Sequence, residues 1–203
     1  MTHFFAGSTH HTDSLGHDVI VEAGDVAWMH AGAGIVHAER TPDALRARGG
    51  SGHGVQAWVA LPEDMERSAP RFELVRARDV PTLVRGGLEV RVLVGELLGA
   101  RAPIQTCSPV LLAALRADTS AGETMLELGP GRHALYIAEG LGARDGHRVG
   151  VGTLLLLAED AAPRVRLEVG SIALVLGGES LGRRFMQGNV IASSAALLDE
   201  TLG

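Results

Sequence analysis

Short apolar runs recur along the whole chain, and each ends at a turn-forming residue such as Gly, Asp, Pro or Asn. Each run has the length of a β-strand, and many short strands between turn signals are typical of an all-β sandwich or barrel. The pattern therefore predicts an all-β fold. The expected strands lie at residues 18–21, 25–29, 55–61, 88–94, 134–138, 153–157, 165–169 and 171–176.

Similar turn signals occur in both halves of the chain, which indicates an internal duplication. Residues 22–25 and 168–171 each place a glycine turn before an apolar strand. Residues 14–17 and 144–147 are glycine-containing turns between strands. Between the halves, residues 95–104 interrupt the strand pattern with glycines and a proline.

These breaks predict two domains. We expect an N-terminal domain at residues 1–94, a connector at 95–104 and a C-terminal domain at 105–203. The Ala- and Leu-rich residues 193–202 predict the start of a helix at the end of the second domain.

The composition agrees with this fold class. Of the 203 residues, 46% are hydrophobic, so the chain can bury a sizeable core. It has 27 glycines, no lysine and few aromatic residues, which suits many tight turns better than a helical bundle. The net charge of −6 argues against direct binding of nucleic acid, because contacts to phosphates need clustered Lys and Arg side chains.

The location of the protein is predicted from its cysteine content and its apolar runs. Cys107 is the only cysteine, so no internal disulfide can form, which is compatible with a reducing cytoplasm. The first residues lack the basic segment and sustained apolar run of a signal peptide. The longest apolar stretches are far shorter than the roughly 20 residues that span a bilayer. We therefore expect a cytoplasmic protein without a membrane partner.

His37 and Glu39 are the strongest candidates for a functional site. They follow a glycine-rich bend at residues 32–34, and residues two apart on a strand project from the same face. An imidazole and a carboxylate placed in this way could hold one metal ion. A mononuclear transition-metal site needs at least three protein ligands, so two alone would hold a metal weakly. The missing partners decide the function.

Other histidines gather in the same part of the sequence, since seven of the nine fall within the first 53 residues. His10 and His11 are adjacent, so on a strand they point to opposite faces and at most one could join His37. His17 lies in a turn signal, and we expect it to be solvated. The side chain of His30 could face either a cavity or the solvent.

The remaining candidate residues are expected to be structural. Trp28, Met29 and Trp58 occupy apolar strand positions, which usually pack inward, so they are expected in the core rather than on a ligand-stacking surface. Cys107 has no histidine nearby in the sequence, which favours a packing role. His133 follows a turn and has no second metal-type residue two positions away, so we expect a structural histidine.

Several motifs together resemble the pirin family, and the resemblance covers nearly the whole chain. The most specific block combines Trp28-Met29 with the Gly-Ile-Val-His-Ala-Glu run that ends at Glu39. Further matching segments lie at residues 13–16, 24–29, 31–39, 56–62, 135–140 and 177–182.

The resemblance implies a bicupin, with two tandem cupin-type β-barrels and one metal site in the first barrel. In pirins that metal is usually iron, held by three histidines and a glutamate. The second ligand motif of the family falls on His37 and Glu39. The first, a His-Pro-His-type pair, would lie before Met1, and His3 matches a non-ligand strand position. The chain therefore resembles a pirin whose first barrel is incomplete, truncated at the N-terminus and also short at the C-terminus.

The resemblance also implies a function. Some pirins resemble quercetin 2,3-dioxygenases, in which ferrous iron or another divalent transition metal activates a flavonol and a carboxylate takes its proton. Glu39 would have that catalytic role here. With only His37 and Glu39 as ligands, we expect weak metal binding and low oxidoreductase activity on a flavonol-like substrate.

Two alternatives remain open at this point. The chain could be a non-enzymatic regulatory module that binds a protein partner, as other pirins resemble partners of transcription factors or metabolic enzymes. It could also be a degenerate remnant, unstable because edge strands are left uncovered. Turnover of a flavonol favours the enzyme, metal-independent retention of a protein favours the module, and aggregation favours the remnant.

Overall fold

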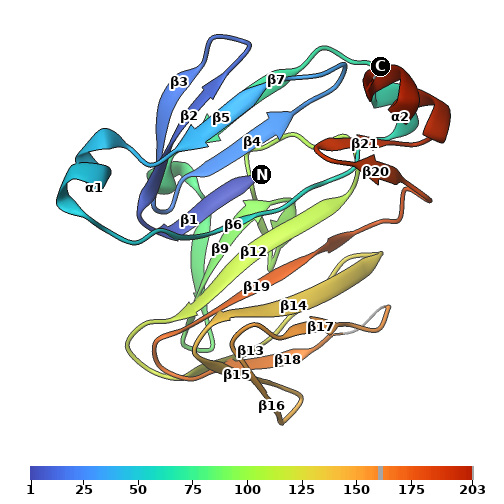
Figure 1. Ribbon diagram of the computed structural model, residues 1–203. Coiled ribbons are helices and arrows are strands. Elements are labelled where there is room, and N and C mark those ends of the chain that lie inside the picture. The colour runs from blue at the N-terminus through green and yellow to red at the C-terminus, as the bar shows by residue number, and fades with distance from the viewer. Residues whose placement is uncertain (160–161, 203) are drawn as a thin grey trace. The chain divides into compact units, whose positions relative to one another are not determined.

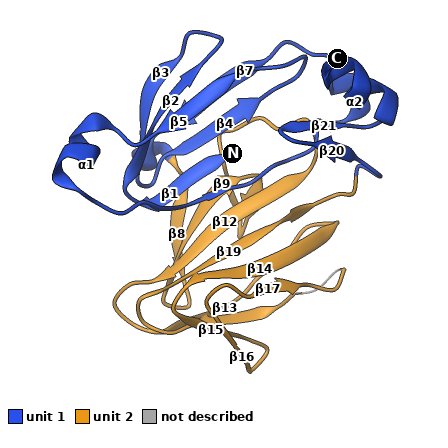
Figure 2. Ribbon diagram, in the orientation of Figure 1, with its two compact units in different colours: residues 1–79, 181–203 blue, residues 80–180 orange. Residues whose placement is uncertain are grey.

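A computed structural model describes residues 1–159 and 162–202 of the chain. These residues form two compact units (Figure 2). The first unit combines Met1–Asp79 with Leu181–Gly203, and the second is Val80–Ser180.

Strands dominate both units, as the hydrophobic pattern predicts (Figure 1). The strands of the first unit are β1 (Thr2–Ala6), β2 (Ser8–Asp13), β3 (Asp18–Glu22), β4 (Val26–His30), β5 (His37–Arg40), β6 (His53–Gln56), β7 (Arg71–Val75), β20 (Phe185–Gln187) and β21 (Val190–Ala192). Its helical elements are α1 (Asp43–Arg48), α2 (Ala195–Leu202) and the short 3-10 turns η1 (Glu63–Met65) and η2 (Ala77–Asp79).

The second unit consists of strands alone within its described residues. They are β8 (Thr82–Arg85), β9 (Leu88–Val94), β10 (Glu96–Leu97), β11 (Ala100–Arg101), β12 (Val110–Ala117), β13 (Gly122–Met125), β14 (Arg132–Glu139), β15 (Leu141–Arg144), β16 (His147–Gly150), β17 (Leu154–Leu156), β18 (Arg164–Leu167) and β19 (Ser171–Gly178).

Each unit has two main sheets. In the first unit a four-stranded sheet has the order β6-β1-β4-β7 and a three-stranded sheet the order β3-β2-β5, with β20 and β21 as a separate hairpin. In the second unit a six-stranded sheet has the order β17-β14-β19-β12-β9-β8 and a four-stranded sheet the order β13-β18-β15-β16. Among the described residues, the paired strands named here are antiparallel, and one isolated parallel bridge joins Phe4 to Ala23.

The core of the second unit lies under the six-stranded sheet. Alternate residues of β9, such as Leu88, Val90 and Val92, are fully buried, as is Leu115 of β12. Apolar side chains at this spacing share one face of a strand, which drives that face into the core. The expected strand at 88–94 has the same bounds as β9, and those at 134–138 and 171–176 lie within β14 and β19.

The two compact units do not coincide with the domain boundaries expected from the sequence at 1–94, 95–104 and 105–203. Strand β9 pairs with β12, so it lies in the second unit although it precedes the expected connector. The connector itself contains the β10-β11 hairpin. The helix expected at 193–202 exists as α2, but it belongs to the first unit.

No helix among the described residues is long and apolar enough to cross a membrane.

The turn between β8 and β9 tests the packing of the second unit. Gly86 has a φ of +56°, and an added Cβ would overlap the carbonyl oxygen of Glu123, a backbone atom that cannot rotate away. We expect Gly86→Ala to lower the free energy of unfolding by about 2–4 kcal/mol, through left-handed strain and overlap. The matched control is Gly146→Ala, because Gly146 has a φ of +83° and open space around it; we expect a loss of about 1 kcal/mol there. Urea unfolding of both variants measures the difference, and equal losses would contradict the packing.

Candidate functional site

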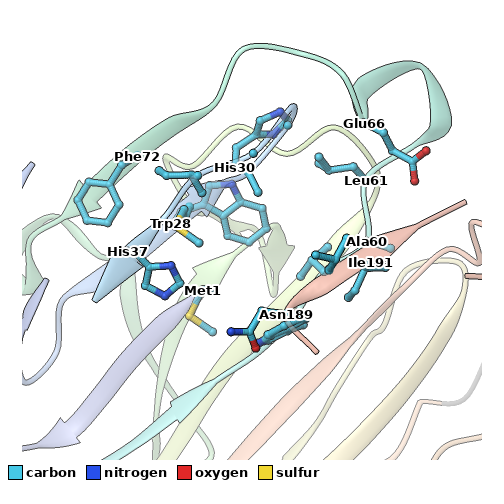
Figure 3. A pocket seen from close by; sticks show the side chains of 18 of the residues that line it. Met1, Trp28, His30, His37, Ala60, Leu61, Glu66, Phe72, Asn189 and Ile191 are labelled. Carbon is cyan, nitrogen blue, oxygen red and sulfur yellow. The ribbon is translucent and has the colours of Figure 1, made fainter. Parts of the chain in front are cut away.

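A cavity of about 840 Å³ lies in the first unit, which is within the size range of pockets for small molecules. Its wall comes from β2, β4 and β5, from the segments at 31–36 and 57–61, and from β21 and α2. Figure 3 shows His37, Phe72 and Trp28 along one part of the wall, and Ala60 and Ile191 along another.

The register between β2 and β5 places four polar side chains on one face of the three-stranded sheet. His11 lies opposite Glu39, and Asp13 lies opposite His37. Paired residues, and residues two apart on a strand, share a face. His37 and Glu39 therefore face the same way, as their spacing predicts, and His11 is the member of the His10-His11 pair that joins them.

His10 points to the other face of β2. Its Nε2 atom lies 2.6 Å from Oδ1 of Asp18, whose side chain is 74% exposed. The alternation along β2 thus separates a surface histidine from an interior one.

The carboxylate of Glu39 is held by two neutral donors. Thr2 Oγ1 donates a hydrogen bond to Oε1 at 3.0 Å, and Gln56 Nε2 donates to Oε2 at 2.9 Å. Gln56 also donates to Thr2 Oγ1 at 3.2 Å, which closes a small network across β1, β5 and β6. Both oxygens of Glu39 are therefore engaged and its orientation is fixed.

The imidazole of His37 is part of a group of aromatic rings. Its centroid lies 5.7 Å from that of His11, with 20° between the ring planes. The ring of His11 in turn stacks on Phe72 at 4.2 Å and 12°. His11 is only 2% exposed, whereas His37 is exposed. The interior histidine is thus locked by packing, and the outer one is accessible.

Asp13 is a fully buried carboxylate that fixes His11. It accepts hydrogen bonds from His11 Nε2 at 3.1 Å, from His17 Nδ1 at 2.9 Å and from the backbone nitrogens of Leu15 and His17. Burial alone would raise the pKa of Asp13, but these hydrogen bonds outweigh it and lower the pKa to about 2. Asp13 is therefore ionised at neutral pH, and both histidine nitrogens beside it must donate.

The donors present do not complete an iron site. Among residues 1–159 and 162–202 no group of three or more His, Cys, Asp or Glu side chains could hold a metal ion. His37 and Glu39 would supply only two ligands, and both oxygens of Glu39 already accept hydrogen bonds. The role of these two residues as metal ligands stays a prediction.

The other histidines of this unit have structural partners. His3 Nδ1 lies 2.8 Å from the carbonyl oxygen of Asp25, and its ring meets Phe5 edge-on at 5.2 Å. His3 follows Thr2 on β1, so it projects away from the face that carries the Thr2 contact to Glu39. His30 is buried beside Ser68, with 2.7 Å between Nε2 and Oγ.

Burial, and then the nearby charge of Arg71, lower the pKa of His30. The structure therefore answers the question that the sequence left open, because His30 is a buried histidine at the cavity wall rather than a solvated one. His17, expected to be solvated, is partly exposed but bonded to Asp13.

The expectation that Trp58 lies in the core was wrong. Trp28 is buried, but Trp58 is 52% exposed and lines the cavity. The reason is that β6 ends at Gln56, so Trp58 lies beyond the strand, where no ladder holds its side chain inward. Met29 is half-buried and also lines the cavity.

The C-terminal segment supplies a wall that local sequence reasoning missed. Glu66 accepts hydrogen bonds from the backbone nitrogen of Ser193 at 2.7 Å and from its Oγ at 2.6 Å. Arg67 forms a two-point ion pair with Glu200 of α2, at 3.0 and 2.6 Å. These contacts anchor α2 to the segment after η1 and bring Leu197 to the cavity. Sequence separations above 120 residues hide such contacts from any local pattern.

Solved structures that are similar to this chain have the cupin fold, and two of them are described as quercetin 2,3-dioxygenases. A quercetin 2,3-dioxygenase from Acinetobacter baumannii superimposes with a TM-score of 0.91 at 25% identity, covering 99% of this chain and 72% of that one. A second structure with that description, from the same organism, has a TM-score of 0.85 at 28% identity, covering 98% of this chain and 65% of that one. The fold expected from the resemblance is thereby confirmed.

The relatives in sequence are pirins. The sequence model described as Pirin matches residues 1–59. A pirin-like protein of Caulobacter vibrioides is 32% identical over 201 residues, which is 98% of this chain and 69% of that protein. The chain therefore belongs to the pirin family. Pirin-1 of Arabidopsis thaliana is 32% identical over 111 residues, covering 55% of this chain and only 37% of that protein.

The pH dependence of stability tests the hydrogen bonds that Asp13 accepts from His11 and His17. Because its pKa is lowered from 3.8 to about 2, its contribution to stability is present above pH 4 and is lost as the pH falls through about 2. We expect Asp13→Asn to cost about 1–3 kcal/mol at pH 7, since buried donors lose their ionised partner.

The same variant should also flatten the loss of stability between pH 4 and pH 2, measured by urea midpoints. Asp18→Asn, which changes the exposed carboxylate beside His10, is the matched control and should alter stability by less than about 0.5 kcal/mol. An acid profile of Asp13→Asn identical to that of the unmodified chain would contradict the assignment.

Proposed function

We propose that the first unit binds a flavonol-like aromatic molecule in its cavity, with weak binding of a divalent transition metal at His37 and Glu39 and low quercetin 2,3-dioxygenase-type activity. The observation that carries this proposal is the cavity of about 840 Å³ with His37 and Glu39 together in its wall. Membership of the pirin family supports it, as do the structural relatives described as quercetin 2,3-dioxygenases.

The wall of the cavity suits a planar aromatic ligand. Phe72, Met29 and the exposed ring of Trp58 provide apolar surface, and flat aromatic faces favour stacked or edge-on contacts with another ring. The wall also carries polar groups, some near β5, such as Glu39 and Gln56, and others in distant segments, such as Asn189. Hydrogen bonds to a few such groups usually orient a ligand in a pocket.

Glu39 is the proton acceptor in this proposal. Its carboxylate is held in place by Thr2 and Gln56 and opens onto the cavity. A fixed carboxylate within hydrogen-bond reach of a ligand hydroxyl can take its proton and make the flavonol more electron-rich. A neutral glutamine at this position would keep the shape and lose that capacity.

Ferrous iron is the proposed metal, although another divalent transition metal would suit the same two ligands. The Escherichia coli pirin YhhW, whose structure shares this fold at 20% identity and a TM-score of 0.64, was crystallised with nickel(II). Here two ligands leave most coordination positions to water, which predicts weak binding. A chain with an added His-x-His pair upstream would bind more tightly.

Iron binding tests the metal part of the proposal. After anaerobic reconstitution with ferrous iron and gel filtration, we expect well below one iron per chain, measured by elemental analysis. His37→Ala should reduce the iron to background, and His10→Ala, on the other face of β2, should leave it unchanged. About one iron per chain that is lost in His37→Ala would show that further groups complete the site. No iron in any sample would refute the metal site.

Turnover of quercetin tests the role of Glu39. With ferrous iron in excess, we expect slow loss of flavonol absorbance coupled to oxygen uptake. Glu39→Gln should lower the rate about 10²-fold or more, since a positioned general base typically contributes that much. A thermal melt of the variant checks that the network with Thr2 and Gln56 still folds. Equal rates in both proteins would exclude Glu39 as the proton acceptor.

A further inference from the structure

A second set of interior groups lies beside the proposed metal pair and is not used by it. His11, Asp13 and Phe72 hold one another by a hydrogen bond of 3.1 Å and a ring stack of 4.2 Å. His11 and Phe72 both line the cavity. The imidazole of His11 is therefore a buried polar ring in a fixed orientation at the wall of a ligand-sized space.

The charge of Asp13 determines which nitrogen of His11 carries the proton. An ionised carboxylate can only accept hydrogen bonds, so Nε2 of His11 must donate to it. A neutral imidazole with its proton on Nε2 has a lone pair on Nδ1. Within residues 1–159 and 162–202, the side chain of His11 forms no hydrogen bond besides that to Asp13. Nδ1 therefore has no hydrogen-bond partner among the described residues, on a side chain that is only 2% exposed and lines the cavity.

The charges around the cavity indicate which kind of ligand could donate a hydrogen bond to Nδ1 of His11. Glu39 and Glu66 are carboxylates in the wall, and Arg67, the one arginine among its described lining residues, is paired with Glu200. Glu66 lies 4.0 Å from Arg184, and the Met1 ammonium in the wall donates to the carbonyl oxygen of Ala57 at 3.0 Å. Glu39, which lies opposite His11, has only neutral donors, so an anionic ligand would meet its carboxylate at a cost, since like charges repel strongly at short range. A neutral ligand that presents a hydroxyl group fits better, and the aromatic neighbours favour a planar ring bearing that hydroxyl.

We propose that His11 is a specificity-determining residue that recognises a hydroxyl group on a planar aromatic ligand by accepting its hydrogen bond at Nδ1, and that this recognition needs no metal. The inference rests on the proposed function in that the ligand occupies the same cavity. It differs because the recognising groups are His11 and Asp13, which are separate from the His37 and Glu39 pair. Asp13 acts through His11, as a positioning residue that holds the ring and places the proton of the neutral imidazole on Nε2.

A binding experiment with two matched ligands tests this directly. The full chain is titrated with 3-hydroxyflavone and with 3-methoxyflavone by quenching of tryptophan fluorescence, in the presence of EDTA. We expect the hydroxyl compound to bind roughly 3- to 10-fold more tightly, the range for one hydrogen bond to a buried neutral acceptor.

Variants at adjacent positions separate the hydrogen bond from the bulk of the methyl group. His11→Phe keeps a ring against Phe72 and removes the acceptor, so the preference for 3-hydroxyflavone should vanish. His11→Gln can both donate to Asp13 and accept from the ligand, so it should restore part of the preference. His10→Phe, one residue away on the opposite face, should retain all of it. Comparing both ligands across the variants gives the coupling of the hydroxyl to His11.

Each outcome has a defined meaning. An unchanged preference in His11→Phe overturns the role of His11 and leaves the proposed function intact. Binding that appears only with ferrous iron overturns the metal-free recognition and supports the proposed function. Absence of binding by either flavone, with and without iron, overturns both. Vanished preference in His11→Phe with partial return in His11→Gln supports the inference.

Discussion

The antiparallel register between β2 and β5 is the constraint on which the site of this pirin depends. It sets His11 opposite Glu39 and Asp13 opposite His37, so four polar groups share one face. A slip by one residue would exchange them for His10 and Thr12 and turn the site to the outer face. On the other side of β2, Thr9 pairs with the fully buried Val21 of β3. Burial of Val21 shows that the face of the sheet that carries Thr9 and His11 is the inner one.

Within that face, a buried negative charge organises its neighbours. A carboxylate removed from water needs several donors, and Asp13 obtains them from His11, His17 and the turn that follows β2. The hydrogen bond from His11 to Asp13 fixes the orientation of the His11 ring, and that ring packs against Phe72. The carboxylate of Glu39 is also held by hydrogen bonds, but its donors are the neutral side chains of Thr2 on β1 and Gln56 on β6. The interior polar groups are satisfied largely by one another, which explains how this wall can be ordered without a third metal ligand.

The sequence predicted those features that depend on local spacing. The strand at 88–94 could be found because alternate apolar residues bury one face, and the shared face of His37 and Glu39 follows from a spacing of two. The cupin fold came from the pirin resemblance. Long-range pairing could not be found in this way, since the membership of β9 in the second unit is set by hydrogen bonds to β12. Trp58 was misplaced because its strand ends two residues earlier.

The sequence spacing of His11 and Asp13 is a signal from which their shared face could have been predicted. His11 and Asp13 have the same spacing of two as His37 and Glu39, and both pairs lie on strands of one sheet. The spacing alone predicts a shared face for each pair, but only the register shows that the two faces are the same one. Because both pairs share one face, the cavity wall contains two sets of polar groups. The accessible His37 and Glu39 have the chemistry to bind a metal or a proton. The buried imidazole of His11 has the chemistry to accept a hydrogen bond from a hydroxyl group. Because His11 is held by Asp13 and Phe72 and not by His37 or Glu39, the proposed recognition of a ligand does not require a metal at the other pair.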